Sequence, residues 1–443
     1  MKKHYLLPIM IILMQSVQAQ WSVEHLSMAR SWIGAVSAQD RVYFAGGYIE
    51  DVVGTMTRRV DIYDNATGTW SIDSISAPRG DLAAAYLNNK IFFAGGTTNG
   101  FGSSKIVDIY DLSTSSWRVD SLLTYQGAAI PAVINNKVLF AGGITVGGTG
   151  VTKIVSVYDD ATGLWSKDSL SLGRFGHGGA AIGDIAVFAG GYTNITTYPA
   201  TNRVDIYNAS TGLWTTAALS QARGNISAIA LGNKIYFAGG LVNVNTGQLS
   251  DRVDIYDVVT GTWNTATLSQ KRRSIALATL GDQIFFAGGE RIFSTMTPSD
   301  RIDIYNVTTN SWTTDTLSVA QDAAVGVSLE NKIMIAGSED YLAHTFLDVV
   351  NVFTSPTAGI GEPTADGILN IWPNPAKDKI TVNIPDDRTG GRIAVCSVSG
   401  QVQMEQPLLT NKTEIDISRL PKGIYFARYA NQSVVAVSKI IKN

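Results

Sequence analysis

The apolar positions of this 443-residue chain fall into short runs that recur with a period of 47 to 49 residues. In the fifth repeat, alternating or short apolar runs at 226–231, 234–238, 252–256 and 261–265 predict four strands. A glycine pair ends the second run of each repeat. The pairs begin at Gly46, Gly95, Gly142, Gly190, Gly239, Gly288 and, as Gly-Ser, at Gly337. A repeat of this length with four short strands predicts one blade of a β-propeller.

Two aromatic positions mark the outer half of each repeat. The first is Tyr63, Tyr110, Tyr158, Tyr207, Tyr256, Tyr305 and Phe353. The second, seven residues further on, is Trp70, Trp117, Trp165, Trp214, Trp263 and Trp312. The seventh tryptophan is missing after Phe353 but is present near the amino terminus as Trp21. This phase shift predicts an all-β ring of seven blades at 20–353, whose last blade is closed by the N-terminal strand.

An arginine (glutamine in two repeats), a small-residue strand, the glycine pair, the tyrosine (phenylalanine in the last repeat) and the tryptophan follow one another in the same order. In this order they resemble the kelch repeat, from Trp21 to about Phe353. The resemblance implies a propeller whose loops between strands two and three share one face with the loops between blades, often the recognition face. Kelch propellers include scaffolds, substrate adaptors, galactose-oxidase-like enzymes and sialic-acid-processing enzymes, so the fold alone does not fix the function.

A charged pair recurs within the repeats. The position sixteen residues before each glycine pair reads Arg30, Arg79, Gln126, Arg174, Arg223, Arg272 and Gln321. The position two residues before the aromatic reads Asp61, Asp108, Ser156, Asp205, Asp254, Asp303 and Asn351. The acid is absent from the same two repeats that lack the arginine. We therefore predict a structural pair in each of the other five, because losing one partner leaves a buried charge alone. A partly ligand-facing role of the arginines is the alternative.

All length variation lies between the glycine pair and the aromatic, an interval of 15 to 17 residues. The loops that carry it are 48–58, 97–105, 144–153, 192–202, 241–251, 290–300 and 339–345. Their aromatic residues are our candidates for ligand binding, namely Tyr48, Phe101, Tyr192, Tyr198, Phe293 and Tyr341. Aromatic faces with neighbouring hydroxyl and amide groups suit a glycan or a peptide. The alternative is that these aromatics are tucked under solvated polar loops.

Signals for catalysis are weak. Beyond residue 19 the histidines are His25, His177 and His344, and there is no HExxH motif, cysteine pair, GxSxG motif or phosphate-binding loop. The single cysteine, Cys396, lies outside the repeats, which excludes the cysteine-modified tyrosine of the copper oxidases among kelch propellers. We predict no catalytic residue, metal or cofactor. His177, three residues after Arg174, is a candidate acid–base in the channel, with a packed histidine as the alternative.

Charge and the first residues bear on partners and location. A net charge of −3 argues against nucleic acid as a partner. Residues 1–19 combine Lys2 and Lys3, an apolar run at 6–14 and Ala19 before Gln20, which together predict a secretory signal. Because the run is too short to span a bilayer, we expect no transmembrane segment after cleavage. A retained anchor is the alternative.

A different pattern begins after Phe353. Residues 354–367 have the composition of a linker. Short alternating runs at 379–384, 392–398 and 424–429 then predict a small β-sandwich at 368–443.

This C-terminal segment resembles the type A C-terminal sorting domain of the type IX secretion system. The features that carry the likeness are Pro373-Asn374-Pro375, the turn at 398–401, the stretch at 415–425 and the basic end at 438–442. The resemblance implies a Gram-negative bacterium, the type IX secretion machinery as a partner, and a protein that is released or held at the outer cell surface. An accessory sandwich, such as a carbohydrate-binding module, is the alternative.

The sequence therefore predicts a secreted or cell-surface propeller that binds an extracellular glycan or protein through the loops between strands two and three. One alternative is a glycan-processing enzyme, such as an isomerase or lyase acting on sialic acid or another sugar. It would use an arginine with His177 or a loop carboxylate at the channel mouth. The other alternative is a purely structural adhesion module.

Overall fold

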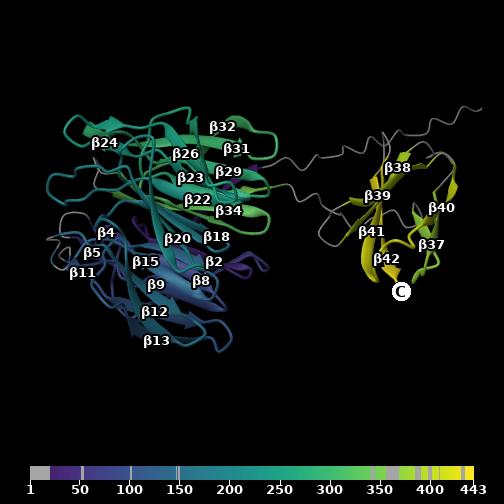
Figure 1. Cartoon of the computed structure of the whole chain (residues 1–443), viewed down its shortest axis with the longest axis horizontal. Helices are drawn as coiled ribbons and strands as arrows, with labels where there is room; N and C mark the ends of the chain where they lie inside the picture. The colour runs from purple at the N-terminus through teal and green to yellow at the C-terminus, as the bar shows by residue number, and fades with distance from the viewer. Residues whose placement is uncertain are drawn as a thin grey trace, which may run out of the picture. The chain divides into compact units, whose positions relative to one another are not determined.

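The computed structural model describes residues 20–50, 54–99, 102–145, 147, 150–340, 345–355, 369–384, 391–397, 402–408, 410–430 and 435–443. The chain forms two compact units, Met1–Ser355 and Pro356–Asn443 (Figure 1). The predicted signal at 1–19 lies outside the described residues, and so does all of the predicted linker except its first two residues. Each unit is considered by itself.

In the first unit, the described residues form seven antiparallel sheets built on four long strands each. From its innermost strand outwards, the first sheet contains β2 (Gly34–Ala38), β3 (Arg41–Ala45), β6 (Arg59–Asp64) and β7 (Thr69–Ser74). The second contains β8 (Ala83–Leu87), β9 (Lys90–Ala94), β12 (Ile106–Asp111) and β13 (Ser116–Ser121). The third contains β14 (Ile130–Ile134), β15 (Lys137–Ala141), β16 (Ile154–Asp159) and β17 (Leu164–Ser169). The fourth sheet contains β18 (Gly178–Ile182), β19 (Ile185–Ala189), β20 (Arg203–Asn208) and β21 (Leu213–Ala218). The fifth contains β22 (Ser227–Leu231), β23 (Lys234–Ala238), β26 (Arg252–Asp257) and β27 (Thr262–Thr267). The sixth sheet contains β28 (Ala276–Leu280), β29 (Gln283–Ala287), β31 (Thr297–Asn306) and β32 (Ser311–Gln321). The seventh contains β33 (Val325–Ser328), β34 (Lys332–Asp340), β35 (Thr345–Thr354) and β1 (Gln20–His25).

The sheets are arranged as a closed ring. Their innermost strands contact one another in the order β2, β8, β14, β18, β22, β28, β33 and back to β2. The predicted all-β propeller is thus confirmed, with one sheet per blade. Strand β1 completes the last blade by pairing with β35, so that Trp21 lies opposite Phe353 with their ring centroids 5.1 Å apart.

The burial of each strand follows its place in the blade. The second strands are almost entirely buried, as in β9 with Phe92 and Phe93, because neighbouring blades cover both faces. The outermost strands alternate between exposed and partly buried positions, since only one face packs on the next blade. Tyr256 and Trp263 pair across adjacent strands with centroids 4.9 Å apart, and this pairing recurs around the ring.

Short hairpins extend from several of the loops that join strands two and three. They are β4 (Tyr48–Glu50) with β5 (Thr55–Met56), β10 (Thr97–Thr98) with β11 (Gly102–Ser103), and β24 (Leu241–Asn243) with β25 (Gln248–Leu249). In the sixth blade, β30 (Glu290–Ile292) and the 3₁₀ turn Phe293–Thr295 take this place. The length variation predicted from the sequence therefore builds extra structure on one face of the propeller.

Each arginine of the repeat lies against the aspartate of its own repeat, and both side chains are buried. Nitrogen–oxygen distances of 2.7 Å separate Arg30 and Asp61, Arg174 and Asp205, and Arg223 and Asp254. The same contact joins Arg79 to Asp108 and Arg272 to Asp303.

The guanidinium also satisfies main-chain carbonyls where strands two and three diverge at the glycine pair. Arg223 donates from Nε to the oxygen of Gly239, 2.7 Å away, and from Nη2 to that of Phe237, 3.0 Å away. Its partner Asp254 accepts the backbone N–H of Ser220 at 3.0 Å. Because Ser220 lies in the linker from the preceding blade, the pair fastens that linker to the strands of the next blade.

The two repeats without the ion pair keep the same hydrogen bonds with neutral groups. Gln126 donates to the oxygen of Gly142 at 2.8 Å and accepts the Ser156 hydroxyl at 2.6 Å. Gln321 likewise accepts the Asn351 amide at 2.7 Å. An amide with a hydroxyl or amide partner thus replaces a guanidinium with a carboxylate, and no charge is left alone.

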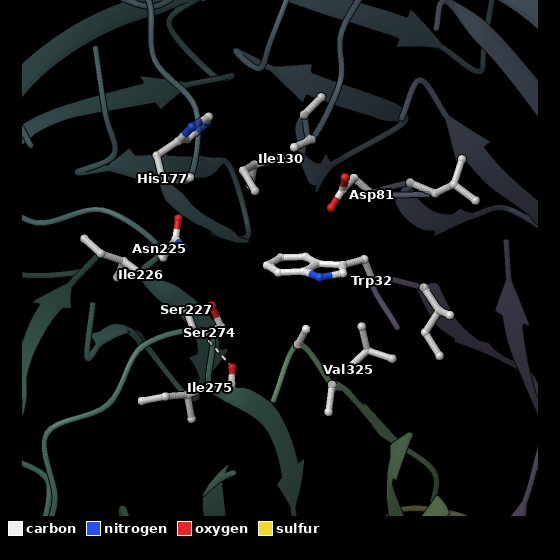
Figure 2. A pocket seen from close by; sticks show the side chains of 17 residues that line it. Trp32, Asp81, Ile130, His177, Asn225, Ile226, Ser227, Ser274, Ile275 and Val325 are labelled. Carbon is white, nitrogen blue, oxygen red and sulfur yellow. Dashed lines mark hydrogen bonds between the residues drawn. The ribbon is translucent and has the colours of Figure 1, made fainter. Parts of the chain in front are cut away.

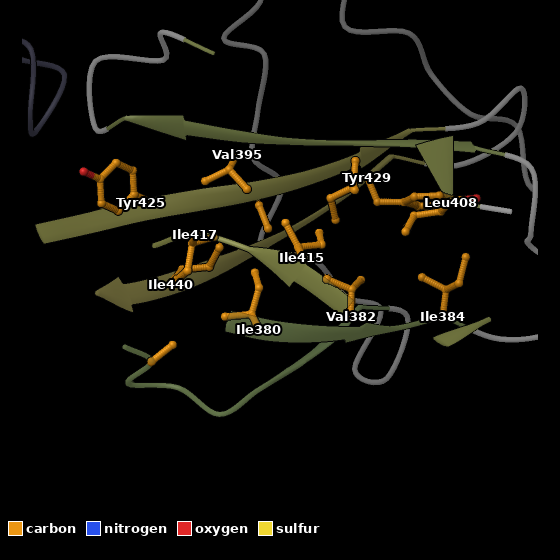
Figure 3. Packing of buried hydrophobic residues seen from close by; sticks show 13 residues of the cluster. Ile380, Val382, Ile384, Val395, Leu408, Ile415, Ile417, Tyr425, Tyr429 and Ile440 are labelled. Carbon is orange, nitrogen blue, oxygen red and sulfur yellow. The ribbon is translucent and has the colours of Figure 1, made fainter. Parts of the chain in front are cut away.

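The second unit is a small β-sandwich of two sheets. One contains β36 (Asn370–Trp372), β37 (Lys379–Asn383) and β40 (Lys412–Asp416); the other contains β38 (Gly391–Ser397), β39 (Val402–Leu408), β41 (Gly423–Ala430) and β42 (Val435–Lys442). Buried side chains from both sheets, among them Ile380, Ile415 and Tyr429, form its core (Figure 3). Asn374 holds the end of the chain in place, since its side chain donates to Lys439 O and accepts the N–H of Ile441.

We predict that Arg79→Gln and Asp108→Ser couple strongly, because together they reproduce the neutral pair of Gln126 and Ser156. Each single substitution leaves a buried group unpaired and costs about 3–5 kcal/mol. The double variant is expected to cost less than the two together by about 2 kcal/mol or more in a denaturant-unfolding cycle. The exposed pair of Arg118 and Asp120 is the control, with an expected coupling below about 1 kcal/mol. Additive effects at Arg79 and Asp108 would contradict the assignment.

Candidate functional site

A ring of seven residues surrounds the channel on the face that carries the variable loops. Each lies two residues after the arginine or glutamine of its repeat and has a left-handed backbone. The seven, with their φ angles, are Trp32 (49°), Asp81 (51°), Ala128 (51°), Gly176 (60°), Asn225 (49°), Ser274 (50°) and Ala323 (52°). We call them the mouth ring. Six of them are not glycine, and a left-handed non-glycine residue costs about 1 kcal/mol or more.

Hydrogen bonds between blades hold this backbone conformation. The N–H of Asp81 donates to Trp32 O at 2.9 Å, that of Ser274 to Asn225 O at 3.3 Å, and that of Trp32 to Ala323 O at 3.4 Å. Three pairs of neighbouring mouth-ring members are thereby bonded to each other. The seven positions share one backbone conformation, and their side chains differ from blade to blade.

The mouth ring and the residues just after it line a cavity of about 320 Å³. Figure 2 shows the Trp32 indole reaching into the middle of the opening, with Asp81 beside it and Asn225 and Ser274 across from it. The cavity is within the size range of small-ligand sites. An aromatic face, a carboxyl, an amide and a hydroxyl converge in it.

Asp81 is fixed by two hydroxyl groups from neighbouring loops. Its Oδ2 accepts Thr97 Oγ1 at 3.0 Å and the Tyr48 hydroxyl at 3.1 Å, and these two hydroxyls lie 2.6 Å apart. Burial raises the pKa of Asp81 to about 6, although the two hydrogen bonds act in the opposite direction. The carboxyl is thus ionised at neutral pH and close to its titration range.

A second charged group lies further out on the same face. Arg273 Nη2 is 2.5 Å from Glu290 Oε2, and Glu290 is fully buried. Burial, and next the charge of Glu290, raise the pKa of Asp322 to about 7. The Ser31 hydroxyl donates to Glu339 at 2.8 Å. Acidic side chains therefore gather on the second, sixth and seventh blades, whereas the third to fifth blades present mainly small or apolar groups to the cavity.

His177 lines the cavity but occupies a packing position. The corresponding residues of the other repeats are Ile33, Leu82, Ala129, Ile226, Ile275 and Ala324. Its Cε1 would lie 2.8 Å from a β-carbon on Gly142, just as Ile275 Cδ1 would lie 2.7 Å from one on Gly239. Burial, and next the Arg174 guanidinium, hold the pKa of His177 well below its usual value of 6.5. His177 is therefore a neutral side chain in an apolar slot between blades.

The variable-loop aromatics lie in different environments. Tyr48 supports Asp81 through its hydroxyl. Tyr192 is 2% exposed and packs in a small apolar cluster under the loops. Tyr198 is 38% exposed and meets Tyr192 edge to face at 5.4 Å. Phe293 lies under the Arg273 guanidinium at 4.8 Å and lines a groove of about 460 Å³ with Val244 and other loop residues. The candidates Phe101 and Tyr341 lie outside the described residues.

Trp32, Asp81, Asn225 and Ser274 were not among the residues that the sequence pointed to. Their spacing carried a usable signal, since they lie at a fixed distance from the arginine in a segment of constant length. The predicted five arginines, in contrast, are buried in the structural pairs and do not line this cavity.

The fold and its mouth define a β-propeller with a concave, partly polar opening on its loop face. Comparison with known proteins agrees with both units. Residues 222–267 match the kelch motif, and residues 370–443 match the secretion system C-terminal sorting domain. The chain is similar to a solved structure entitled "Structure of YjhT", at 16% identity and a TM-score of 0.52, over 66% of this chain and 99% of that chain. At this identity the likeness shows the fold alone. A search of curated proteins found no match.

The chain thus carries a kelch motif and a type IX sorting domain, and both resemblances are confirmed. The sorting domain makes this a secreted or outer-surface protein that engages the type IX secretion machinery. Within the described residues, no helix is long and apolar enough to cross a bilayer. The same residues contain no group of three or more histidine, cysteine or acidic side chains placed to hold a metal ion.

We predict that His177→Leu makes the propeller less sensitive to acid. Below pH 6.5 the unfolded chain takes up a proton on His177 that the native chain does not, so the native state loses up to about 1.4 kcal/mol per pH unit. Above pH 7 this contribution is absent. Unfolding free energies between pH 7.5 and 5 should fall less steeply for His177→Leu than for the wild type, while Ile226→Leu in the equivalent slot keeps the wild-type slope. Identical slopes for all three proteins would refute the assignment.

Proposed function

We propose that this protein is a secreted or surface-located glycan-binding protein, and that the glycan binds on the loop face with one sugar in the mouth. The observation that carries the proposal is the mouth ring with Trp32 reaching into its cavity. Aromatic side chains bind the apolar face of a sugar ring, while carboxyl, amide and hydroxyl groups bind its hydroxyls. Trp32, Asp81, Asn225 and Ser274 supply this set within one cavity.

The variable loops extend the proposed site beyond the first sugar. Ser31 bridges to Tyr48 and Gly224 to Leu241, so the base of each loop is joined to the segment that leads into the mouth ring. The exposed Tyr198 and the groove at Phe293 would then contact the remainder of a longer glycan. A protein ligand on the same face is the alternative, and it would use the loops without filling the mouth.

A glycan-processing enzyme is a second candidate, favoured by Asp81. A carboxyl whose pKa is about 6 can exchange a proton near neutral pH, as general acid–base catalysis requires. Such an enzyme would act through Asp81 rather than through His177, since His177 fills a packing slot. Release of a modified sugar that depends on Asp81, followed by NMR, would establish catalysis; binding without turnover would exclude it for the sugars tested.

We predict that Trp32→Ala weakens glycan binding at least about tenfold, the worth of one aromatic stacking contact. The fold should be kept, because alanine already occupies this position as Ala128 and Ala323. A glycan array identifies the ligand and titration calorimetry gives the affinities. Leu164→Ala, on the exposed outer strand β17, is the matched control and should bind like the wild type. Undiminished binding by Trp32→Ala would remove the mouth from the site.

A further inference from the structure

The mouth carries a negative charge that the surrounding protein does not neutralise. Four acidic side chains act on one another near the mouth, namely Asp81, Glu290, Asp322 and Glu339, and the cation that acts on two of them is Arg273. Arg273 is already engaged by Glu290 and Phe293. Among the described residues, Asp81 takes part in no ion pair, although its carboxyl lines the cavity.

Hydrogen bonds hold the Asp81 carboxyl in place. The hydroxyls of Thr97 and Tyr48 both donate to Oδ2, and the main-chain N–H is bonded to Trp32 O. Figure 2 shows the Asp81 carboxyl at the edge of the mouth, next to the indole of Trp32. A cation entering the cavity would therefore meet a fixed carboxylate and an aromatic face together, the two groups that bind an ammonium most strongly.

We propose that the mouth takes an amino sugar with a free ammonium group. The pyranose ring stacks on Trp32, the ammonium lies against Asp81, and hydroxyls of the sugar reach Asn225 and Ser274. This inference rests on the proposed function and adds the charge of the ligand to it. An N-acetylated sugar is disfavoured, because its amide is neutral and leaves the carboxylate without a counter-ion in a partly buried site.

Two features favour a sugar over the lysine side chain of a protein. A lysine would place a flexible alkyl stem beside Trp32 and would leave the amide of Asn225 and the hydroxyl of Ser274 without polar partners on the ligand. A hexosamine presents a rigid apolar face to the indole and hydroxyls to the opposite wall, and it loses less conformational freedom on binding.

The experiment is calorimetry at pH 7 with the full chain and three probes, glucosamine, N-acetylglucosamine and glucose. We expect glucosamine to bind at least about tenfold more tightly than the other two, through its charge and its cation–π contact. In Asp81→Asn the three affinities should become equal to within about threefold. Asparagine is accommodated here, since Asn225 occupies the same position in another blade. The control is Glu330→Gln, since Glu330 is an exposed residue in the turn between β33 and β34, away from the mouth. This variant changes the net charge equally and should keep the preference for glucosamine.

The possible results separate this inference from the proposed function. Equal binding of all three sugars that is lost in Trp32→Ala would overturn the amine preference and leave the glycan site standing. A glucosamine preference that survives in Asp81→Asn would overturn the role of Asp81. Nα-acetyl-lysine amide binding as tightly as glucosamine would overturn the sugar as occupant. Failure of every saccharide, on the array as well as in calorimetry, would overturn both proposals.

Acid supplies an independent readout. Asp81 faces Tyr48, Thr97 and Trp32, and the nearby charge that acts on it is that of Glu339. Since burial raises the pKa of Asp81 to about 6, its charge is present above pH 6 and is lost below it. The glucosamine preference should therefore shrink more between pH 7 and pH 5 in the wild type than in Asp81→Asn, in which Asp322, with a pKa of about 7, is the remaining acid that titrates in this range. A preference that does not change with pH in the wild type would contradict the proposal.

Discussion

The buried guanidinium at the entrance of five blades, replaced by a glutamine amide in the other two, is the interaction on which the rest of the propeller depends. Strands two and three must part at the glycine pair so that the loop between them can emerge, and this leaves carbonyl oxygens without partners inside the protein. Arg223 illustrates the solution, since it donates to two such carbonyls and to Asp254. Asp254 in turn accepts an N–H from the linker of the preceding blade. One polar group therefore closes the sheet, anchors the linker and joins neighbouring blades.

The same anchor also sets the geometry of the mouth. Two residues after the arginine or glutamine, the chain turns through the left-handed conformation, and at three positions it bonds to its counterpart on the neighbouring blade. Because the backbone at this point is fixed by the anchor on one side and the inner strand on the other, the side chain is free to vary without loss of the fold. The sequence uses this freedom, for the ring contains an indole, a carboxyl, an amide, a hydroxyl, two methyl groups and a glycine. Stability and, in the function that we propose, recognition therefore depend on neighbouring but separate positions.

Periodicity made the fold and the anchors predictable, but it marks the mouth ring only by its fixed distance from the arginine and not by residue type. The arginine and the aspartate recur in five repeats and are absent together in two, so one chain contains the information needed to pair them. The mouth ring has the opposite character, because seven positions share a conformation and differ in residue type. Its left-handed backbone arises from bonds between blades, which no local propensity expresses. The loop aromatics were chosen by residue type alone, and the structure distributes the four that it describes among a support for Asp81, a buried cluster and the exposed surface.

The uneven charge of the loop face follows because the residues that stabilise the blades are not the residues that line the mouth. The buried arginines do not line the mouth, and each is paired with its own aspartate within the blade. His177, the other potential cation at the cavity, is held neutral by burial and by Arg174. What remains next to the mouth is the acidic set on the second, sixth and seventh blades, with Arg273 as the cation that acts on it. The field in the mouth is thus set by a few variable positions, Asp81 foremost. A change of one such residue would alter the charge of the preferred ligand while the anchors, and with them the propeller, stay the same.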